Sequence, residues 1–483
     1  MSDVPAETIA PAPGLLKWTP AERESFFDAI ARHRRAAWRV HAVSFVASAL
    51  VALVVALLLS PLFYAALSLL CDLANLIVPT INLVEVLGRH VGPIVDAPEK
   101  TSIPEWMVLG FWAALPGLVF MAATLFVMRR AVTLSGLLEG ATFAVSPPNE
   151  QRLDEQRFRN VVAEMAVAAS IPEPRLLIAE WDSENAAVFG ARDGEAVIVV
   201  ARRVLESLDR AQLQAVAAHL VGSIANGDMA IGARVATTIG LFGVIARLGT
   251  AFTQGASLLR LLRRFFAAAF RPAPAAARAF IEEVADPFRE EPSDQPAQAG
   301  QRTDWRTFVW MPFAGPIFAT GFFGGIIGSF VLEPLVSLAW RRRKYLADAT
   351  AVRLTREPNA LSDALQHLGG GGHTPLGAWG AHLCVVRPSV RSGGLFGGSV
   401  VPAFPALERR LRALVALGAS SAPAPISLPI GKIALIAPLA VIVAGLMTLA
   451  LGLLVWLSIG LSALFLGLPF GIIHLLLRWI GHA

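Results

Sequence analysis

The sequence predicts a mainly α-helical polytopic membrane protein that carries a smaller α+β domain in the cytoplasm. Its 483 residues are 55% hydrophobic and only 16% charged, with a mean hydropathy of +0.58. That composition is too apolar for a soluble multidomain chain. Long uncharged runs also alternate with segments of mixed polar and apolar character, which indicates a soluble domain interrupted by membrane spans.

The first two spans are the clearest. Residues 42–70 and 107–128 contain no Asp, Glu, Lys or Arg, and each run is long enough to cross a bilayer core of about 30 Å. Arginines precede the first run and follow the second, whereas the loop between them, 71–106, holds only two Lys or Arg residues. The positive-inside rule therefore places the N-terminus and residue 130 onward in the cytoplasm.

The next two spans are interrupted or flanked by charge. Residues 230–253 contain Arg234 and Arg247, and residues 307–332 form a fourth apolar run. If both runs cross the bilayer, the linker 254–306 lies outside despite its eight arginines. A shallow or re-entrant hairpin is therefore an alternative for this pair. The linker turns from basic to Pro/Ala-rich and then acidic, a composition typical of partial disorder.

The last apolar run, residues 433–477, is too long for one span and predicts two. Six spans are expected in all. The predicted organisation is a cytoplasmic segment 1–41, a transmembrane hairpin 42–130, a split soluble domain 131–229 and 341–426, spans three and four at 230–340, and a C-terminal transmembrane hairpin 427–483. The Arg- and Ala-rich, Lys-poor composition favours a bacterial source, so the predicted location is the inner membrane.

The stretch AVAAHLVGSIANGDM, residues 215–229, carries the most specific signal. Asp209 and Gln212 form a capping-box pattern that begins a helix, on which His219 and Ser223 lie one turn apart on the same face. Two histidines at that spacing converge on one zinc ion, and a glutamate beside the first acts as general base. Here Leu220 replaces the glutamate and Ser223 replaces the second histidine.

Two strands are expected before this helix. Residues 176–178 and 196–200 are apolar, with a turn at 191–194, which predicts a β-hairpin. The second strand is either buried core or an edge strand able to pair with an extended peptide. The candidate peptide-binding residues are Val197, Ile198, Val199 and Val200.

These motifs resemble those of the integral-membrane zinc metallopeptidases of the HtpX type, relatives of the CAAX prenyl endopeptidases in metallopeptidase family 48. Residues 215–229 are similar to the family's zinc helix, and RRRKYLADATA at 341–351 is similar to its third-ligand segment. PAFPALERRLRAL at 402–414 and the segment beginning at Asn185 resemble two further family motifs. The resemblance covers about 130–418 and implies a zincin-like soluble domain.

The resemblance also implies a role for each matched position. The zinc-ligand positions are occupied by His219, Ser223 and Lys344; the position of the catalytic glutamate holds Leu220, and that of a histidine near the transition state holds Phe404. Supporting positions are retained as Asn226, Asp228, Asp348 and Arg410. No catalytic residue is therefore expected. Because an ammonium repels a metal ion, Lys344 is expected to occupy the empty site and pair with Asp348, four residues on.

The sequence therefore predicts a membrane-anchored pseudopeptidase that needs no cofactor and binds a peptide, a membrane-protein partner or an active relative. The alternatives are an active zinc endopeptidase in protein quality control with unconventional ligands, and a membrane scaffold or transport accessory. A relocated metal site could draw on His367, His373 or His382. The lipid bilayer is an expected partner. Nucleic acid is not, because no basic run is interleaved with aromatic residues.

Overall fold

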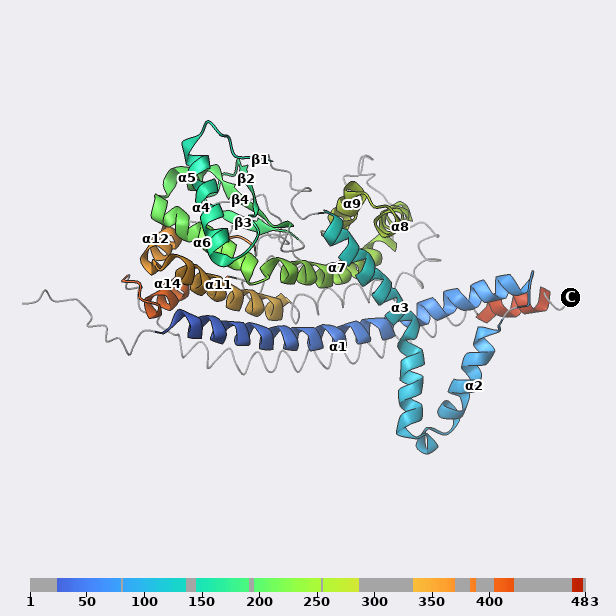
Figure 1. The fold of residues 1–483 in the computed structure, drawn as a ribbon. Coiled ribbons are helices and arrows are strands. Elements are labelled where there is room, and N and C mark those ends of the chain that lie inside the picture. The colour runs from blue at the N-terminus through green and yellow to red at the C-terminus, as the bar shows by residue number, and fades with distance from the viewer. Residues whose placement is uncertain are drawn as a thin grey trace, which may run out of the picture.

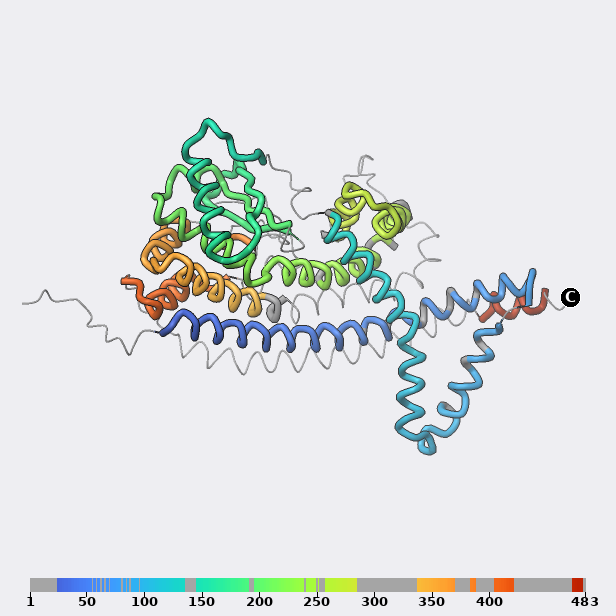
Figure 2. The backbone as a smooth tube through the Cα atoms, in the orientation of Figure 1, coloured from blue at the N-terminus to red at the C-terminus, as the bar shows by residue number. Residues whose placement is uncertain are grey.

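A computed structural model gives the fold of the protein (Figure 1). The residues that it describes are 24–79, 81–135, 145–190, 195–252, 255–285, 333–369, 383–387, 404–420 and 471–480. Figure 2 traces the same backbone as a tube and shows α1 running along one side of the molecule, with the α/β part above its N-terminal half.

Three of the described helices are long and apolar enough to cross a membrane: α1 (Phe26–Asn75), α3 (Ile103–Ser135) and α7 (Asp228–Phe252). They include the first three predicted spans and support an integral membrane protein. The fourth predicted span and most of the final pair lie outside the described residues. Within that last region, residues 471–480 form a short apolar helix.

α1 and α3 cross at very close range. Ser60 Oγ on α1 donates to Ala56 O at 2.8 Å and accepts a hydrogen bond from Gly117 N of α3 at 3.0 Å. A Cβ atom on Gly117 would overlap the Ala56 backbone, so only glycine permits this approach. Beyond the crossing, α3 forms a V with α2 (Leu83–Asp96), which is linked to it through the short 3-10 turn η2 (Pro98–Lys100) (Figure 1).

The soluble part contains a four-stranded sheet of order β1-β2-β4-β3. Its strands are β1 (Val145–Ser146), β2 (Arg175–Ala179), β3 (Ala186–Phe189) and β4 (Val197–Ala201). The predicted hairpin is wrong, because β2 and β4 are parallel, with Ile178 opposite Val200. The antiparallel partner of β4 is β3, which sequence reasoning missed because its Ala-Ala start has low strand propensity.

The prediction that Val197 to Val200 form an edge strand is also wrong. β4 lies between β2 and β3 and pairs with both along its length, so its backbone groups are satisfied within the sheet. β3 is the strand at that side of the sheet, and Ala187 already bridges to Cys384. The buried-core interpretation of residues 197–200 is therefore correct.

Six helices surround the sheet in the described part of this domain: α4 (Leu153–Ala169), α5 (Arg202–Ser207), α6 (Arg210–Ala225), α11 (Glu333–Thr355), α12 (Pro358–Leu368) and α14 (Leu407–Ala416). α6 starts at the predicted capping box, with Asp209 accepting from Gln212 N at 2.8 Å. It is buried on all sides from Ala215 to Ile224, so it is the central helix of the core.

α6 and α11 approach closely at Gly222. A Cβ atom on Gly222 would lie 3.1 Å from both the Cβ and the Cγ2 of Thr350 on α11. This contact fixes the distance between the helix that carries His219 and the helix that carries Lys344 and Asp348. α11 in turn lies beside α1 (Figure 1), so the core domain is attached directly to the first span.

The linker predicted to be partly disordered contains two helices, α8 (Gly255–Phe270) and α9 (Pro274–Ala285). Both pack against α3 and α7. Glu283 of α9 is buried between Arg247 of α7, at 2.7 Å, and Arg264 of α8, at 2.6 Å. Composition alone did not reveal these helices because the charges that suggested disorder neutralise one another. Residues 286–306 lie outside the described part.

Candidate functional site

His219 lies in the middle of α6 and is 1% exposed. Its Nδ1 atom lies 2.9 Å from Asp348 Oδ1 on α11, but neither ring nitrogen has a well-aligned hydrogen bond to a described residue. Burial lowers the pKa of His219 to about 4, outweighing the opposing effect of Asp348. The imidazole is therefore neutral at pH 7.

Asp348 is held by Arg410 of α14 as well. The guanidinium donates to both carboxylate oxygens, at 2.8 and 2.7 Å, and to Val385 O at 2.7 Å. Burial would raise the pKa of Asp348, but the guanidinium of Arg410 and the bond to His219 hold it well below its usual range. The result is a buried His–Asp–Arg chain that joins α6, α11 and α14.

Lys344 is 4% exposed, and its ammonium does not form the predicted pair with Asp348. Instead Nζ donates a hydrogen bond to Cys384 O and lies 5.3 Å from the centre of the Phe404 ring. Asp348 is already occupied by His219 and Arg410, which explains the difference. Burial lowers the pKa of Lys344 to about 8, with Arg410 adding to the effect, so the amine is mostly protonated at pH 7.

A second polar group adjoins the first at the end of α6. Arg343 forms an ion pair with Asp228 and donates to Asn226 O. The Asn226 side chain donates to Thr350 Oγ1 at 3.0 Å, and Ser223 hydrogen-bonds Asp228. Asn226 and Asp228 thus support the turn between α6 and α7 and its contact with α11.

Leu220 and Phe404, at the two catalytic positions implied by the resemblance, are parts of the hydrophobic core. Leu220 is 1% exposed and Phe404 is 7% exposed. Leu220 packs within the main cluster of buried side chains and has no proton-accepting atom. Neither side chain can move a proton.

Sequence reasoning missed Arg343 and the segment 383–387. Residues 341–344 read RRRK, and four consecutive helical residues point in four directions. Because α11 lies between α1 and α6, some residues of such a run must be buried. The helical period of the run could therefore have indicated that Arg343 is buried. Segment 383–387 carries no motif and contributes mainly backbone carbonyls, which no sequence pattern marks.

Of the three histidines proposed for a relocated metal site, one, His367, lies among the described residues. His367 lies on the surface, with Nε2 3.6 Å from Glu184 Oε2. His373 and His382 lie outside the described residues. Within the described residues, no group of three or more His, Cys, Asp and Glu side chains could hold a metal ion.

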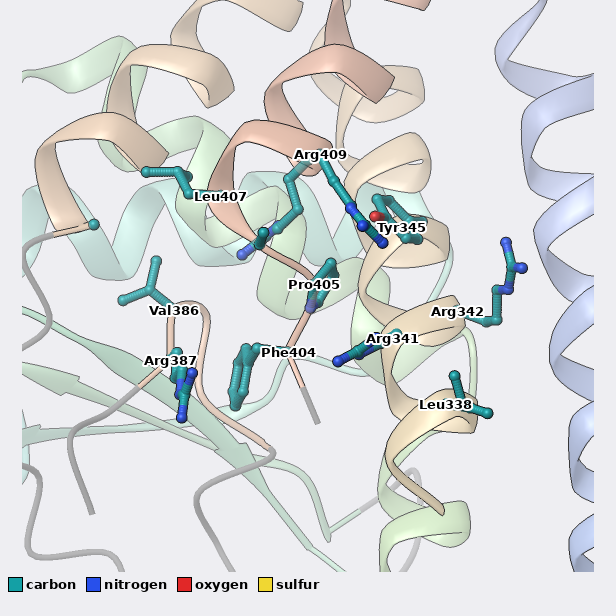
Figure 3. Close-up of a pocket in the computed structure, with 13 residues that line it drawn as sticks. Leu338, Arg341, Arg342, Tyr345, Val386, Arg387, Phe404, Pro405, Leu407 and Arg409 are labelled. Carbon is teal, nitrogen blue, oxygen red and sulfur yellow. The ribbon is translucent and has the colours of Figure 1, made fainter. Parts of the chain in front are cut away.

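A cavity of about 550 Å³ opens beside the Asp348–Arg410 pair (Figure 3). Phe404 lines this cavity and also lies against Lys344, whose Nζ is 5.3 Å from the ring centre. Its lining residues are Leu338, Arg341, Arg342, Tyr345, Gly369, Val386, Arg387, Phe404, Pro405, Ala406, Leu407, Arg409 and Arg410. The lining thus combines apolar side chains with five arginines.

Comparison with known proteins identifies the class of this architecture. Residues 152–284 match the family described as peptidase family M48. The protease HtpX homologue of Thermoanaerobacter pseudethanolicus is 27% identical over 264 residues, covering 54% of this chain and 71% of the relative. The homologue of Persephonella marina is 28% identical over 275 residues, covering 53% of this chain and 73% of the relative. No solved structure matches.

The matched residues are therefore similar to a family of membrane metallopeptidases. Within it, the relatives that the chain matches over about half of its length are named as protease HtpX homologues. The resemblance inferred from the sequence motifs is therefore confirmed at the level of the family.

The prediction that no cofactor is needed is contradicted by this family similarity. M48 proteins of the HtpX type are zinc metalloproteases, so the family points to zinc. The side chains at the three implied ligand positions are not the set that normally binds a catalytic zinc ion. A catalytic zinc site uses three His, Cys, Asp or Glu ligands, whereas here a single imidazole is accompanied by a hydroxyl and a protonated amine.

Proposed function

We propose that this protein is a membrane-anchored, non-catalytic member of the metallopeptidase family that binds peptide or membrane-protein partners. The observation that carries the proposal is the position of Leu220, a fully buried core residue where the family's general base would stand. Without a base beside His219, no side chain at that position takes a proton from an attacking water.

The surroundings of Leu220 support the same proposal. The imidazole of His219 contacts the carboxylate of Asp348, and the ammonium of Lys344 donates a hydrogen bond to Cys384 O. These groups stabilise the packing of α6, α11 and α14 against one another. The residues at the family's ligand positions therefore stabilise the fold. A stable domain without a catalytic base is suited to binding a partner.

The bilayer-facing helices suit a membrane-protein partner. Large apolar side chains on α1 and α3 are exposed, including Phe45 at 75% and Phe126 at 63%. In a bilayer such faces contact lipid or another membrane protein. A cytoplasmic position of the soluble domain follows from the positive-inside rule.

A proteolysis assay tests the proposal. The purified full-length protein is incubated with casein and with a membrane-protein substrate, in added zinc and in chelator, beside a His219→Ala variant. We expect no cleavage that depends on zinc and on His219. Chelator-sensitive cleavage that His219→Ala abolishes would overturn the proposal.

The second candidate function is that of an active zinc endopeptidase with unconventional ligands. Its support is the similarity to relatives named as proteases. The same assay decides between the two, because this alternative requires zinc-dependent cleavage by the unaltered chain. The scaffold alternative depends on the C-terminal hairpin 427–483, which lies mostly outside the described residues.

A further inference from the structure

Helix α8 has one buried and one exposed apolar face. Leu261 and Ala268 are buried in the cluster that α8 forms with α3, α7 and α9. The exposed face consists of Leu259, Leu262, Phe266 and Phe270, whose side chains are 70, 41, 55 and 77% exposed. Because these four residues are three or four positions apart, they form one continuous stripe along the helix. Such a stripe indicates contact with lipid or with protein.

Arginines border this exposed stripe. Arg263 follows Leu262, and Arg271 follows Phe270; both arginines are exposed. The helical hydrogen bond from Arg271 N to Ala267 O, at 2.9 Å, continues α8 as far as Arg271. Successive residues of an α-helix are about 100° apart, so both arginines lie on the same flank of the stripe. An apolar stripe bordered by arginines is typical of helices that lie in the headgroup region of a bilayer.

The contacts of α8 place it at the end of a membrane span. The buried cluster that joins α8 and α9 to α3 contains four residues of α3, Val127, Met128, Ala131 and Val132. The uncharged run of α3 ends at Met128, and Arg129 and Arg130 follow it. α8 therefore lies where α3 leaves the apolar part of the bilayer, on the side from which the chain continues into α4 and the soluble domain.

The direction of α8 agrees with this position. Figures 1 and 2 show α8 nearly along its axis, whereas α1 runs across the same view. α8 thus lies across the direction of the first span, as a helix in the plane of the membrane does. Leu125 and Phe126, near the same end of α3, are exposed as well, so apolar surface is present on both helices at this level.

We propose that α8 is an interfacial membrane helix whose exposed stripe lies in the leaflet on the side of the soluble domain. Helices of this kind bury their apolar side by roughly 5–10 Å at the boundary between headgroups and acyl chains. Arg263 and Arg271 then lie at the level of the lipid phosphates, with which guanidinium groups form charge-assisted hydrogen bonds. The chain that leaves α8 consequently stays on the side of the soluble domain, as the shallow hairpin considered for spans three and four requires.

Depth-dependent fluorescence quenching of the full-length protein tests this position. The protein is reconstituted in vesicles of phosphatidylcholine and phosphatidylglycerol that contain lipids with a nitroxide on the headgroup, on carbon 5 or on carbon 12 of an acyl chain. An environment-sensitive fluorophore is attached to Phe266→Cys in a background lacking Cys71, since Cys384 is fully buried. Val119→Cys, exposed in the middle of the uncharged run of α3, is the deep reference, and Glu164→Cys on α4 is the reference in water.

We expect the label at Phe266→Cys to be quenched at least about twofold more by the carbon-5 nitroxide than by the carbon-12 nitroxide, because the stripe enters only the boundary region. A label at Arg263→Cys should be quenched most by the headgroup nitroxide. At Val119→Cys the carbon-12 nitroxide should be the stronger quencher, and at Glu164→Cys all three should have little effect. Circular dichroism establishes that each variant is folded, and Leu262→Cys replaces Phe266→Cys if that variant is not.

Two results would overturn the proposal. Stronger quenching by carbon 12 than by carbon 5 at Phe266→Cys would place α8 in the centre of the bilayer as part of a span. Quenching by none of the three lipids would show that the stripe does not contact the membrane. In that case iodide added to the water distinguishes a stripe exposed to solvent, where it quenches, from one covered by another part of the chain or a protein partner, where it does not.

Discussion

Buried charges surround His219, and each has a different partner. Asp348 is satisfied by Arg410 and His219, Asp228 by Arg343, and Lys344 by a backbone carbonyl and an aromatic ring. Removing one member of a buried pair leaves the other without compensation, which costs far more than losing an exposed pair. The stability of the domain therefore depends on single side chains in this cluster.

Arg410→Gln tests this dependence. The change leaves Asp348 buried without its guanidinium, and we expect the free energy of unfolding in detergent to fall by about 3–5 kcal/mol. Arg409→Gln, an adjacent exposed residue, is the control and should change it by less than about 0.5 kcal/mol. Similar losses in both variants would contradict the assigned role of Arg410.

The buried ammonium of Lys344 is expected to make the free energy of unfolding depend on pH. Burial lowers its pKa from 10.5 to about 8, so between about pH 8 and pH 10 the unfolded chain binds a proton that the folded protein has released. Unfolding then takes up a proton, and stability rises with pH in that window. Below pH 8 both states are protonated, and the cost of burying the ammonium is present in full.

The measurement is chemical unfolding in detergent at pH 7.5 and pH 9.5. The native protein should gain up to about 2 kcal/mol more than a Lys344→Met variant over this interval. Lys100→Met removes an exposed lysine and should retain the native pH dependence. If Lys344→Met retains it too, the ammonium is not the titrating group.

At the scale of elements, the contact between α6 and α11 decides the geometry of the site. Gly222 allows these helices to approach until a Cβ would lie 3.1 Å from Thr350. Asn226 and Thr350 add a hydrogen bond across the same contact. A larger side chain at 222 must separate the helices, and with them His219 and Asp348.

Gly222→Val is expected to lower the free energy of unfolding by about 1–3 kcal/mol, the usual cost of overpacking. Combining it with Thr350→Ser should restore part of the loss, because the substitution removes the Cγ2 methyl but keeps the hydroxyl bonded to Asn226. Gly88→Ala is the control, since its Cβ would meet nothing within 4 Å; thermal unfolding should show no loss there. Absence of any rescue by Thr350→Ser would show that this contact is not limiting.

At the scale of the whole molecule, the arrangement of α1, α2 and α3 predicts the orientation in the membrane. Arginines gather before the uncharged run of α1 and after that of α3. The positive-inside rule therefore places the loop around Glu99 outside and α4 in the cytoplasm. α11 packs beside α1, so we expect the core domain on the same side of the membrane as the N-terminal end of α1.

Labelling with a membrane-impermeant maleimide checks this orientation. Glu99→Cys and Glu164→Cys introduce exposed cysteines on η2 and α4 in a background lacking Cys71. In intact cells of an expression host stripped of their outer membrane, we expect Glu99→Cys to react and Glu164→Cys to react only after the membrane is permeabilised. The reverse pattern would invert the proposed topology.

The sequence by itself determined the membrane class and the first three apolar helices, because hydropathy is a local property. His219, Leu220 and Ser223 lie on one helix, so their relation could be read from the helical period. The family assignment depended on the same local motifs.

Only the tertiary structure decided which groups meet across elements. It placed β4 between two other strands of the sheet. It paired Asp348 with Arg410 and not with Lys344, and it brought arginines from three segments to one cavity. The physical reason is that backbone pairing and buried charges are satisfied by whichever partner the packing of distant segments brings near. Residues 341–344 illustrate the point, since one run of like charges supplies both the cavity and two buried cations.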